Sequence, residues 1–123
     1  MNIRIFSGDV SIVATLRDTP TAQAIAMALP ITSRAQIWGE EVYFSVPVNA
    51  AIEADAKDVV EAGELAFWVE GNCIAIAYGK TPISQGNEIR LAARTNIWAD
   101  AIDDVRLLVA IQAGDQIDVV AEE

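Results

Sequence analysis

The sequence contains no histidine and a single cysteine, Cys73. Because a disulfide needs two cysteines, none can form within the chain, and zinc sites built from cysteine and histidine are excluded. The lack of histidine also removes the Ser-His-Asp triad, the Cys-His pair and histidine as a general acid or base. We therefore expect no catalytic residue, metal site or cofactor, and a protein that resides in a reducing cytoplasm.

Long apolar runs, glycine and proline are also scarce. No apolar run approaches the roughly 18 residues that span a bilayer. The N-terminal residues 1–11 include Arg4 and lack the long apolar centre of a signal peptide. With 53% hydrophobic residues, seven glycines and four prolines, the chain has the composition of a folded domain. Its 123 residues are the size of one ordinary domain, so we expect a single domain over residues 1–123.

Positively charged residues are also few. Eight Lys and Arg stand against 18 Asp and Glu, a formal net charge of −10. Residues 1–38 have three bases against two acids (+1), residues 39–70 one base against eight acids (−7), and residues 71–123 four bases against eight acids (−4). Such a surface repels nucleic acid phosphates and anionic lipid, so we expect neither nucleic acid nor a membrane as a partner.

What the chain does contain is a succession of short β-patterns, the first at residues 2–6 and 10–17. In the second of these, four apolar side chains share one face at a period of two: Val10, Ile12, Ala14 and Leu16. Further patterns cover residues 31–38, 41–48, 65–69, 73–78, 89–92, 95–102 and 116–121. The acidic, alanine-rich residues 49–62 are interpreted as an irregular connection.

Two short helices are expected among these strands. Residues 20–29 follow a capping residue, Thr19, and stop before Pro30. Residues 103–112 open with two acids, which favour the first turn of a helix. Many short strands with regular turn signals indicate a closed barrel or a sandwich, and a closed barrel also removes exposed strand edges.

At Gly79-Lys80-Thr81 the sequence looks like the end of a nucleotide-binding P-loop. The motif requires another glycine five residues before Gly79, where Ile74 stands, and a long helix after Thr81, where Pro82 stands. The preceding residues form a β-pattern and no glycine-rich loop. We therefore interpret Gly79 as the bend that ends a strand.

This last β-pattern resembles the central strand of cyclophilins. The run from Gly71 to Thr81, GNCIAIAYGKT, matches that strand in register. The order around it also fits, with two strands, a helix led by Pro20, a strand that ends at Pro47, and a later strand at residues 96–101.

More closely, the whole chain is similar to a family of small prokaryotic cyclophilin-like proteins of unestablished function. The stretches that carry this similarity are residues 18–22, 38–44, 63–68, 78–84 and 88–90. The resemblance implies a mainly β fold, a closed eight-stranded cyclophilin-like barrel with two short capping helices.

The resemblance does not bring the isomerase chemistry with it. Cyclophilins place an arginine on the strand that ends in the proline matching Pro47, and the register puts Phe44 there. A glutamine and an aromatic residue of the cyclophilin central strand match Cys73 and Ala75. Phe44 can donate no hydrogen bond and Cys73 only a weak one, so the resemblance implies a protein without the isomerase machinery.

The central β-pattern also predicts where a ligand lies. Residues at a period of two share one face of a strand, which places Cys73, Ala75 and Ala77 together. These small side chains either floor a groove for a ligand or make room for a packed helix or loop, and the resemblance favours the groove. We expect the groove to be bordered by Phe44 and by either Trp68 or Trp98. Arg94 or Asn96 is expected to extend into the groove and to supply a hydrogen bond. The predicted ligand-binding residues are Phe44, Trp68, Cys73, Ala75, Arg94, Asn96 and Trp98.

The tryptophans and two of the arginines can each have a structural role or a role in ligand binding. Of Trp38, Trp68 and Trp98, we expect one to be a pocket wall and two to belong to the core. Arg90 and Arg94 either bind a ligand carboxylate or form ordinary salt bridges with surface acids, and the salt bridges are favoured.

Three functional hypotheses remain open at this stage. The first is a module that binds a small molecule or a peptide and catalyses nothing. The second is a prolyl isomerase whose missing donor is supplied by Arg34 or Arg94. The third follows from cyclophilin-like barrels that form parts of amide- and urea-processing enzymes, of which this chain can be a subunit or relative.

Overall fold

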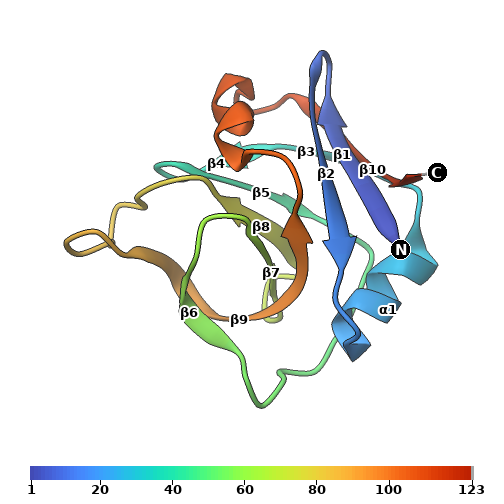
Figure 1. The fold of residues 1–123 in the computed structure, drawn as a ribbon, viewed down its shortest axis with the longest axis horizontal. Helices are drawn as coiled ribbons and strands as arrows, with labels where there is room; N and C mark the ends of the chain where they lie inside the picture. Colours follow the sequence, from blue (N-terminus) through green and yellow to red (C-terminus); the bar gives the residue numbers. More distant parts are fainter. Residues whose placement is uncertain (123) are drawn as a thin grey trace.

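The computed structural model describes residues 1–122, which form antiparallel strands, one α-helix and one 3-10 helix (Figure 1). In chain order the elements are β1 (Asn2–Ser7), β2 (Val10–Leu16), α1 (Pro20–Ala28), β3 (Ile31–Arg34), β4 (Gln36–Ile37), β5 (Glu41–Ser45), β6 (Lys57–Val60), β7 (Glu64–Trp68), β8 (Cys73–Ala77), β9 (Ile89–Ala101), η1 (Val105–Ala110) and β10 (Gln116–Glu122). No helix in this part of the chain is long and apolar enough to cross a bilayer.

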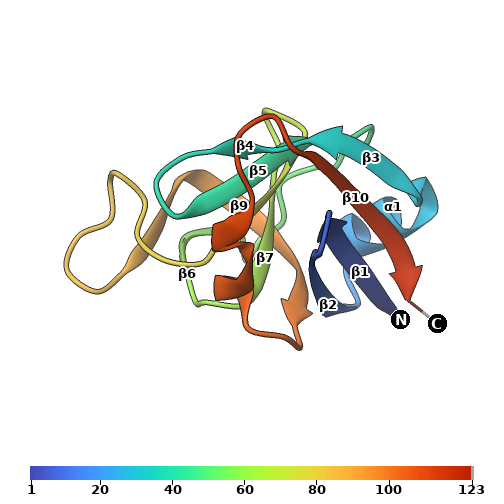
Figure 2. The ribbon, with the colours of Figure 1, turned by 90° about the horizontal axis from the view of Figure 1, so that it is seen from above.

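The strands are arranged in the order β3-β10-β1-β2-β9-β7-β8-β5-β4, and β6 pairs with β9 beside this path. The mainly β fold class is confirmed. A closed eight-stranded barrel is not, because the sheet over residues 1–122 has ten strands and no ladder joins its two end strands, β3 and β4. The sheet curls instead, so that β1, β2 and β10 lie on one side of the molecule and β5, β7 and β8 on the other (Figures 1 and 2).

Ala35 is the single residue between the two end strands, β3 and β4. Its N–H donates to the carbonyl of Asp115 at 2.8 Å, and its own carbonyl accepts the N–H of Gly114 at 2.8 Å. Both backbone groups of Ala35 are therefore bonded to the turn that precedes β10, next to the ladder between β3 and β10.

Apolar side chains form two clusters, one on each face of β8. The main core fills the inside of the curled sheet and takes Ile74 and Ile76 from β8. A second cluster on the opposite face contains Ala75 and Ala77, packed against Val60 of β6 and against side chains of β9. The predicted division of this strand into a face of small residues and a face of large ones is confirmed.

The helices and the connection before β6 differ in how well the sequence predicted them. α1 confirms the helix expected over residues 20–29, with Thr19 as its N-cap. The helix expected over residues 103–112 is the shorter 3-10 helix η1, which is capped by the side chain of Asp104. Residues 49–62 are irregular only at first and then form β6, because β9 offers that segment a partner strand.

β9 joins two strands that the sequence predicts separately. Its ladder with β6 pairs Arg90 with Val59 and Thr95 with Lys57, so β9 has three extra residues between these positions. Such a bulge bends the strand and interrupts the period of two along it, which is why the sequence pattern breaks there.

Asn96 of β9 holds the irregular connection against the start of α1. Its Nδ2 donates to Thr21 Oγ1 and to the carbonyl of Ala51, both at 2.9 Å, and its Oδ1 accepts the N–H of Glu53 at 2.8 Å. The side chain is fully buried. These bonds give Asn96 a structural role, since a buried amide with satisfied partners secures two segments that have few ladder bonds of their own.

We therefore expect Asn96→Ala to lower the free energy of unfolding by about 2–3 kcal/mol, because it leaves several buried polar groups without partners. Urea denaturation measures this change. Arg94→Ala is the control, since Arg94 is exposed and forms one long bond, 3.4 Å from its Nε to the carbonyl of Ala56. Equal, small effects of both substitutions would contradict the structural role of Asn96.

Candidate functional site

A cavity of about 190 Å³ lies beside the small-residue face of β8. Its lining comes from the β4–β5 turn, β5, β7, β8 and the bulged part of β9: Trp38, Glu41, Tyr43, Trp68, Cys73, Ala75, Leu91, Ala92, Ala93 and Thr95. Ala92 is exposed and the three aromatic side chains are half-buried, so the cavity opens to solvent on their side. Because an apolar cavity of about 150 Å³ can hold a benzene molecule, this one has room for a ligand of one ring.

Cys73 and Ala75 form the floor of the cavity. Ala75 contributes only a methyl group, which leaves space above the strand. The thiol of Cys73 donates to the carbonyl of Gly71 at 3.3 Å and lies 3.8 Å from Ser45 Oγ. The thiol therefore has a hydrogen-bond acceptor just before β8 and a hydroxyl neighbour on β5.

The border on β5 is Tyr43, and the expectation that Phe44 borders the groove is wrong. In the ladder between β5 and β8, Tyr43 lies opposite Ala75 and Phe44 lies opposite Ile74. Phe44 is fully buried in the main core. Because successive side chains of a strand point to opposite faces, a one-residue difference in position puts Phe44 on the inside of the sheet.

Two tryptophans form walls of the cavity. A Cβ at Gly71 would lie 2.2 Å from Cε3 and Cζ3 of Trp68, so only glycine allows the indole to lie directly against the backbone there. Trp38 lies at the β4–β5 turn, where its backbone N–H donates to the carbonyl of Glu41 at 3.0 Å. Gly39 adopts a φ of +60° in this turn, a conformation that favours glycine.

Trp98 does not reach the cavity. The ladder between β7 and β9 pairs Leu65 with Ala99 and Ala66 with Ile97, which leaves Trp98 as one extra, bulged residue. Its ring is fully buried in the main core, and its Nε1 donates to the carbonyl of Ala66 at 3.1 Å. The structure therefore places two tryptophans at the cavity and one in the core, the reverse of the expected division.

The remaining two predicted polar residues also lie away from the cavity lining. Arg94 is exposed, and Asn96 is buried in the network that secures α1. Of the seven predicted ligand-binding residues, the structure brings together Trp68, Cys73 and Ala75 at one cavity. Their role in binding a ligand stays a prediction.

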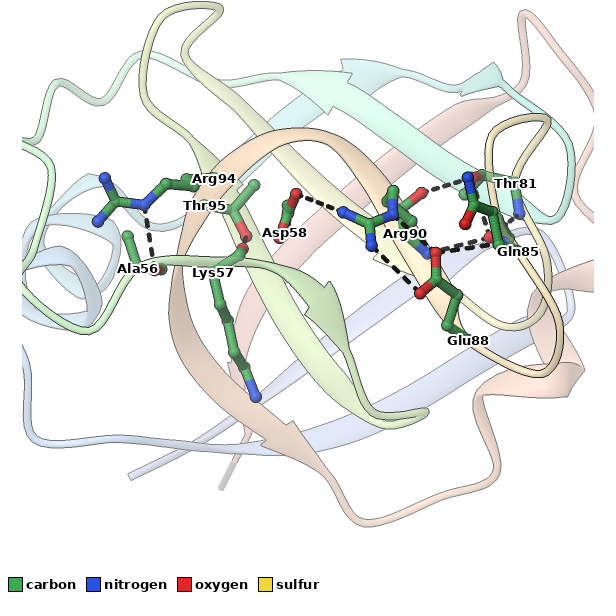
Figure 3. A network of polar contacts seen from close by, with 10 residues as sticks. Ala56, Lys57, Asp58, Thr81, Gln85, Glu88, Arg90, Arg94 and Thr95 are labelled. Atoms are coloured by element: carbon green, nitrogen blue, oxygen red, sulfur yellow. Dashed lines mark hydrogen bonds and ion pairs between the residues drawn. The ribbon is translucent and has the colours of Figure 1, made fainter.

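A polar network holds the wall that β9 forms over the cavity (Figure 3). Arg90 forms ion pairs with Glu88 at 2.7 Å and with Asp58 of β6 at 2.9 Å. Thr81 Oγ1 donates to the carbonyl of Arg90, and Thr95 Oγ1 donates to the β6 backbone at 2.9 Å. The salt-bridge interpretation of Arg90 is confirmed. The bonds of Arg90 and Thr95 together hold β9 at the two ends of the bulge that lines the cavity.

Within the described residues 1–122, Glu41 is the one carboxyl in the cavity lining. Only 6% of this residue is exposed, and its Oε1 is buried without a hydrogen-bond partner among residues 1–122. Burial raises the pKa of Glu41 to about 7, since an ionised carboxylate is poorly solvated there. Glu64 shows the opposite result: burial works to raise its pKa, but hydrogen bonds from the Glu61 N–H, Lys57 and Arg17 lower it overall.

Sequence reasoning missed Glu41 and Tyr43 as site residues, and it considered Trp38 only as one of three tryptophans that could form a pocket wall. A signal for the first two was present, because Glu41 and Tyr43 alternate with the apolar Val42 and Phe44 and so share a face of the strand. That a carboxyl is buried on this face depends on segments distant in the chain and could not be predicted from the local pattern.

The structure is thus an antiparallel sheet curled around its main core, with an aromatic-lined cavity on the outer face of β8. The model of the Cyclophilin-like family matches residues 1–120, so the chain belongs to this family. The family resemblance inferred from the sequence is confirmed.

Solved structures that are similar to this chain include the following two. The hypothetical protein AF2241 from Archaeoglobus fulgidus, solved in solution, is 36% identical, with 99% of this chain and 95% of that chain covered and a TM-score of 0.85. The structure of McbB in complex with tryptophan is 13% identical, with a TM-score of 0.68, so this likeness concerns the fold alone. It covers 98% of this chain but 44% of the McbB chain. No curated protein matches the chain.

The raised pKa of Glu41 makes a prediction for stability. Between about pH 4.5 and pH 7 the unfolded chain releases this proton while the folded chain keeps it, so Glu41 lowers stability as the pH rises through this window. We expect Glu41→Gln to remove the effect. The difference in unfolding free energy between the variant and the wild type should therefore grow in favour of the variant, by up to about 3 kcal/mol, from pH 4.5 to pH 8.

Chemical denaturation at a series of pH values measures this difference. Glu70→Gln is the matched control, since it removes the same charge from an exposed position. A stability difference between Glu41→Gln and the wild type that does not change with pH would contradict the burial of the carboxyl.

Proposed function

We propose that this protein is a binding module for a small molecule, which occupies the cavity over Cys73 and Ala75. The observation that carries the proposal is the combination of an open, mostly apolar cavity with a few convergent polar groups in its lining. Sites for small ligands have this composition, in which apolar and aromatic walls contribute contact area and isolated polar groups fix the orientation.

The size of the cavity favours a small molecule over an extended peptide. A volume of about 190 Å³ accommodates a ring and a short substituent, whereas a peptide needs a longer groove. Trp38 and Trp68 offer large, rigid faces to such a ring, and their half-buried positions leave the entrance accessible. A ligand that covers these walls gains roughly 25 cal/mol per Å² of apolar surface removed from water.

The proposal is tested by a screen of single-ring compounds, with chemical-shift changes in the backbone amide spectrum as the readout. Benzyl alcohol, phenol and indole are suitable probes, and tryptophan is included because McbB was solved with it. We expect saturable shifts at residues of β5, β8 and β9, with weak affinity because small fragments bury little area.

A variant that fills the cavity provides the decisive comparison. Ala75→Trp places a large side chain in the volume above β8, so binding of the probes should be lost while the thermal unfolding remains cooperative. Ala110→Trp, at an exposed position of η1, should bind the probes as the wild type does. Binding that survives Ala75→Trp would show that the ligand lies elsewhere.

Prolyl isomerisation is less well supported by this geometry. Among residues 1–122, no arginine or lysine belongs to the lining of the cavity. Arg34 Nη1 donates to the carbonyl of Gly114 at 3.3 Å, and Arg94 Nε donates to that of Ala56. The absence of a cationic donor at the cavity leaves nothing to hold the peptide carbonyl during its rotation.

We therefore expect the rate of isomerisation of a proline tetrapeptide to equal the uncatalysed rate, with a cyclophilin as the positive control in the same protease-coupled assay. A clear acceleration that disappears in Arg34→Ala or Arg94→Ala would instead show that one of these arginines supplies the donor.

A further inference from the structure

Glu41 is the starting point for the chemistry of the ligand. It is nine-tenths buried, lines the cavity, and has an oxygen without a partner. Other partly buried acids of the chain have donors: Glu53 accepts from Thr21 Oγ1 at 2.6 Å, and Glu64 meets Arg17 and Lys57. A buried carboxyl without a donor is unfavourable for the fold, and a ligand that carries the donor would satisfy it.

The other side chains of the lining complement a positive charge. Two indoles and a phenol, Trp38, Trp68 and Tyr43, surround the same space as Glu41. The faces of aromatic rings attract cations, most strongly those of tryptophan. No lysine or arginine of the described chain lines the cavity and competes for Glu41. An anionic ligand would meet a carboxylate without a compensating base, in a protein of net charge −10.

We propose that the cavity binds a small organic cation, an ammonium on a body of about one ring, with Glu41 as its counter-ion and the aromatic side chains around it. This inference rests on the proposed function, because it names the class of ligand for the same cavity. The ammonium donates to the carboxylate of Glu41, and the apolar body covers Ala75 and the indole walls.

Binding of such a cation is coupled to a proton. The pKa of the buried Glu41 is raised in the empty cavity, so a cation that pairs with the carboxylate displaces the proton and binds more tightly as the pH rises towards 8. The other titratable groups on the elements packed around Glu41 are Tyr43 on β5, Glu40 in the β4–β5 turn, Cys73 and Tyr78 on or next to β8, and Lys80 in the following loop. The bulge of β9 contributes no ionisable side chain to the lining.

The test compares three probes that share one ring: benzylamine, benzyl alcohol and benzoate. Titration calorimetry near pH 8 should show benzylamine binding at least about tenfold more tightly than benzyl alcohol, the gain expected for a buried charge-assisted hydrogen bond. Benzoate should bind more weakly than the alcohol. In Glu41→Gln the ratio of amine to alcohol affinity should fall to near one, and in the control Glu70→Gln it should keep its wild-type value.

A second measurement needs only the wild-type chain and so does not depend on the folding of a variant. The ratio of amine to alcohol affinity should rise about tenfold between pH 5.5 and pH 8, and benzylamine should release a proton to the buffer on binding. The heat of binding in buffers of different ionisation enthalpy reports that release.

The outcomes separate the two proposals. If benzyl alcohol binds as tightly as benzylamine, or benzoate binds best, and the ratio does not change with pH, the cavity binds small molecules but the inference of a cation is overturned. If none of the three probes binds and the broader screen also fails, the proposed function is overturned, and the inference that rests on it falls too.

Discussion

Strand β8 is buried on both faces, and the architecture depends on this constraint. Its alternate side chains belong to two different environments, since Ile74 and Ile76 fill the main core while Cys73 and Ala75 face the cavity. Large residues on one face anchor the curled sheet. Small residues on the other keep a space open that β9 bridges. A strand with large side chains on both faces would have closed the site by packing alone.

The space over β8 persists because a second layer is held above it without collapsing onto it. Three extra residues bulge from β9 in its ladder with β6, and the network around Arg90 and Thr95 fixes both ends of the bulge. Glu41 lies in this protected volume, away from the bases that pair with the other acids of the chain. Burial of an ionisable group without a partner lowers the stability of a fold, and such exceptions to the rules of packing concentrate where proteins bind ligands.

Particular residues show which features of the structure could be predicted from the sequence. The capped helix α1 and the division of β8 into two faces were predictable, because each follows from spacing within a few residues. The assignment of Phe44 to the site relied on the register of a resemblance, although the alternation along β5 already placed Phe44 and Tyr43 on opposite faces. β6 was not predictable, because its acidic segment becomes a strand only where β9 lies beside it.

By itself, the sequence determined most of the elements, the absence of histidine-based chemistry, the family and the small-residue face of β8. Only the tertiary structure decided which side chains meet across that face. Glu41, Trp38 and Trp68 come from different turns and strands, and a carboxyl that would be solvated on an isolated strand is buried in the folded chain. The physical reason is that periodicity is local, whereas burial and electrostatics depend on segments distant in the chain.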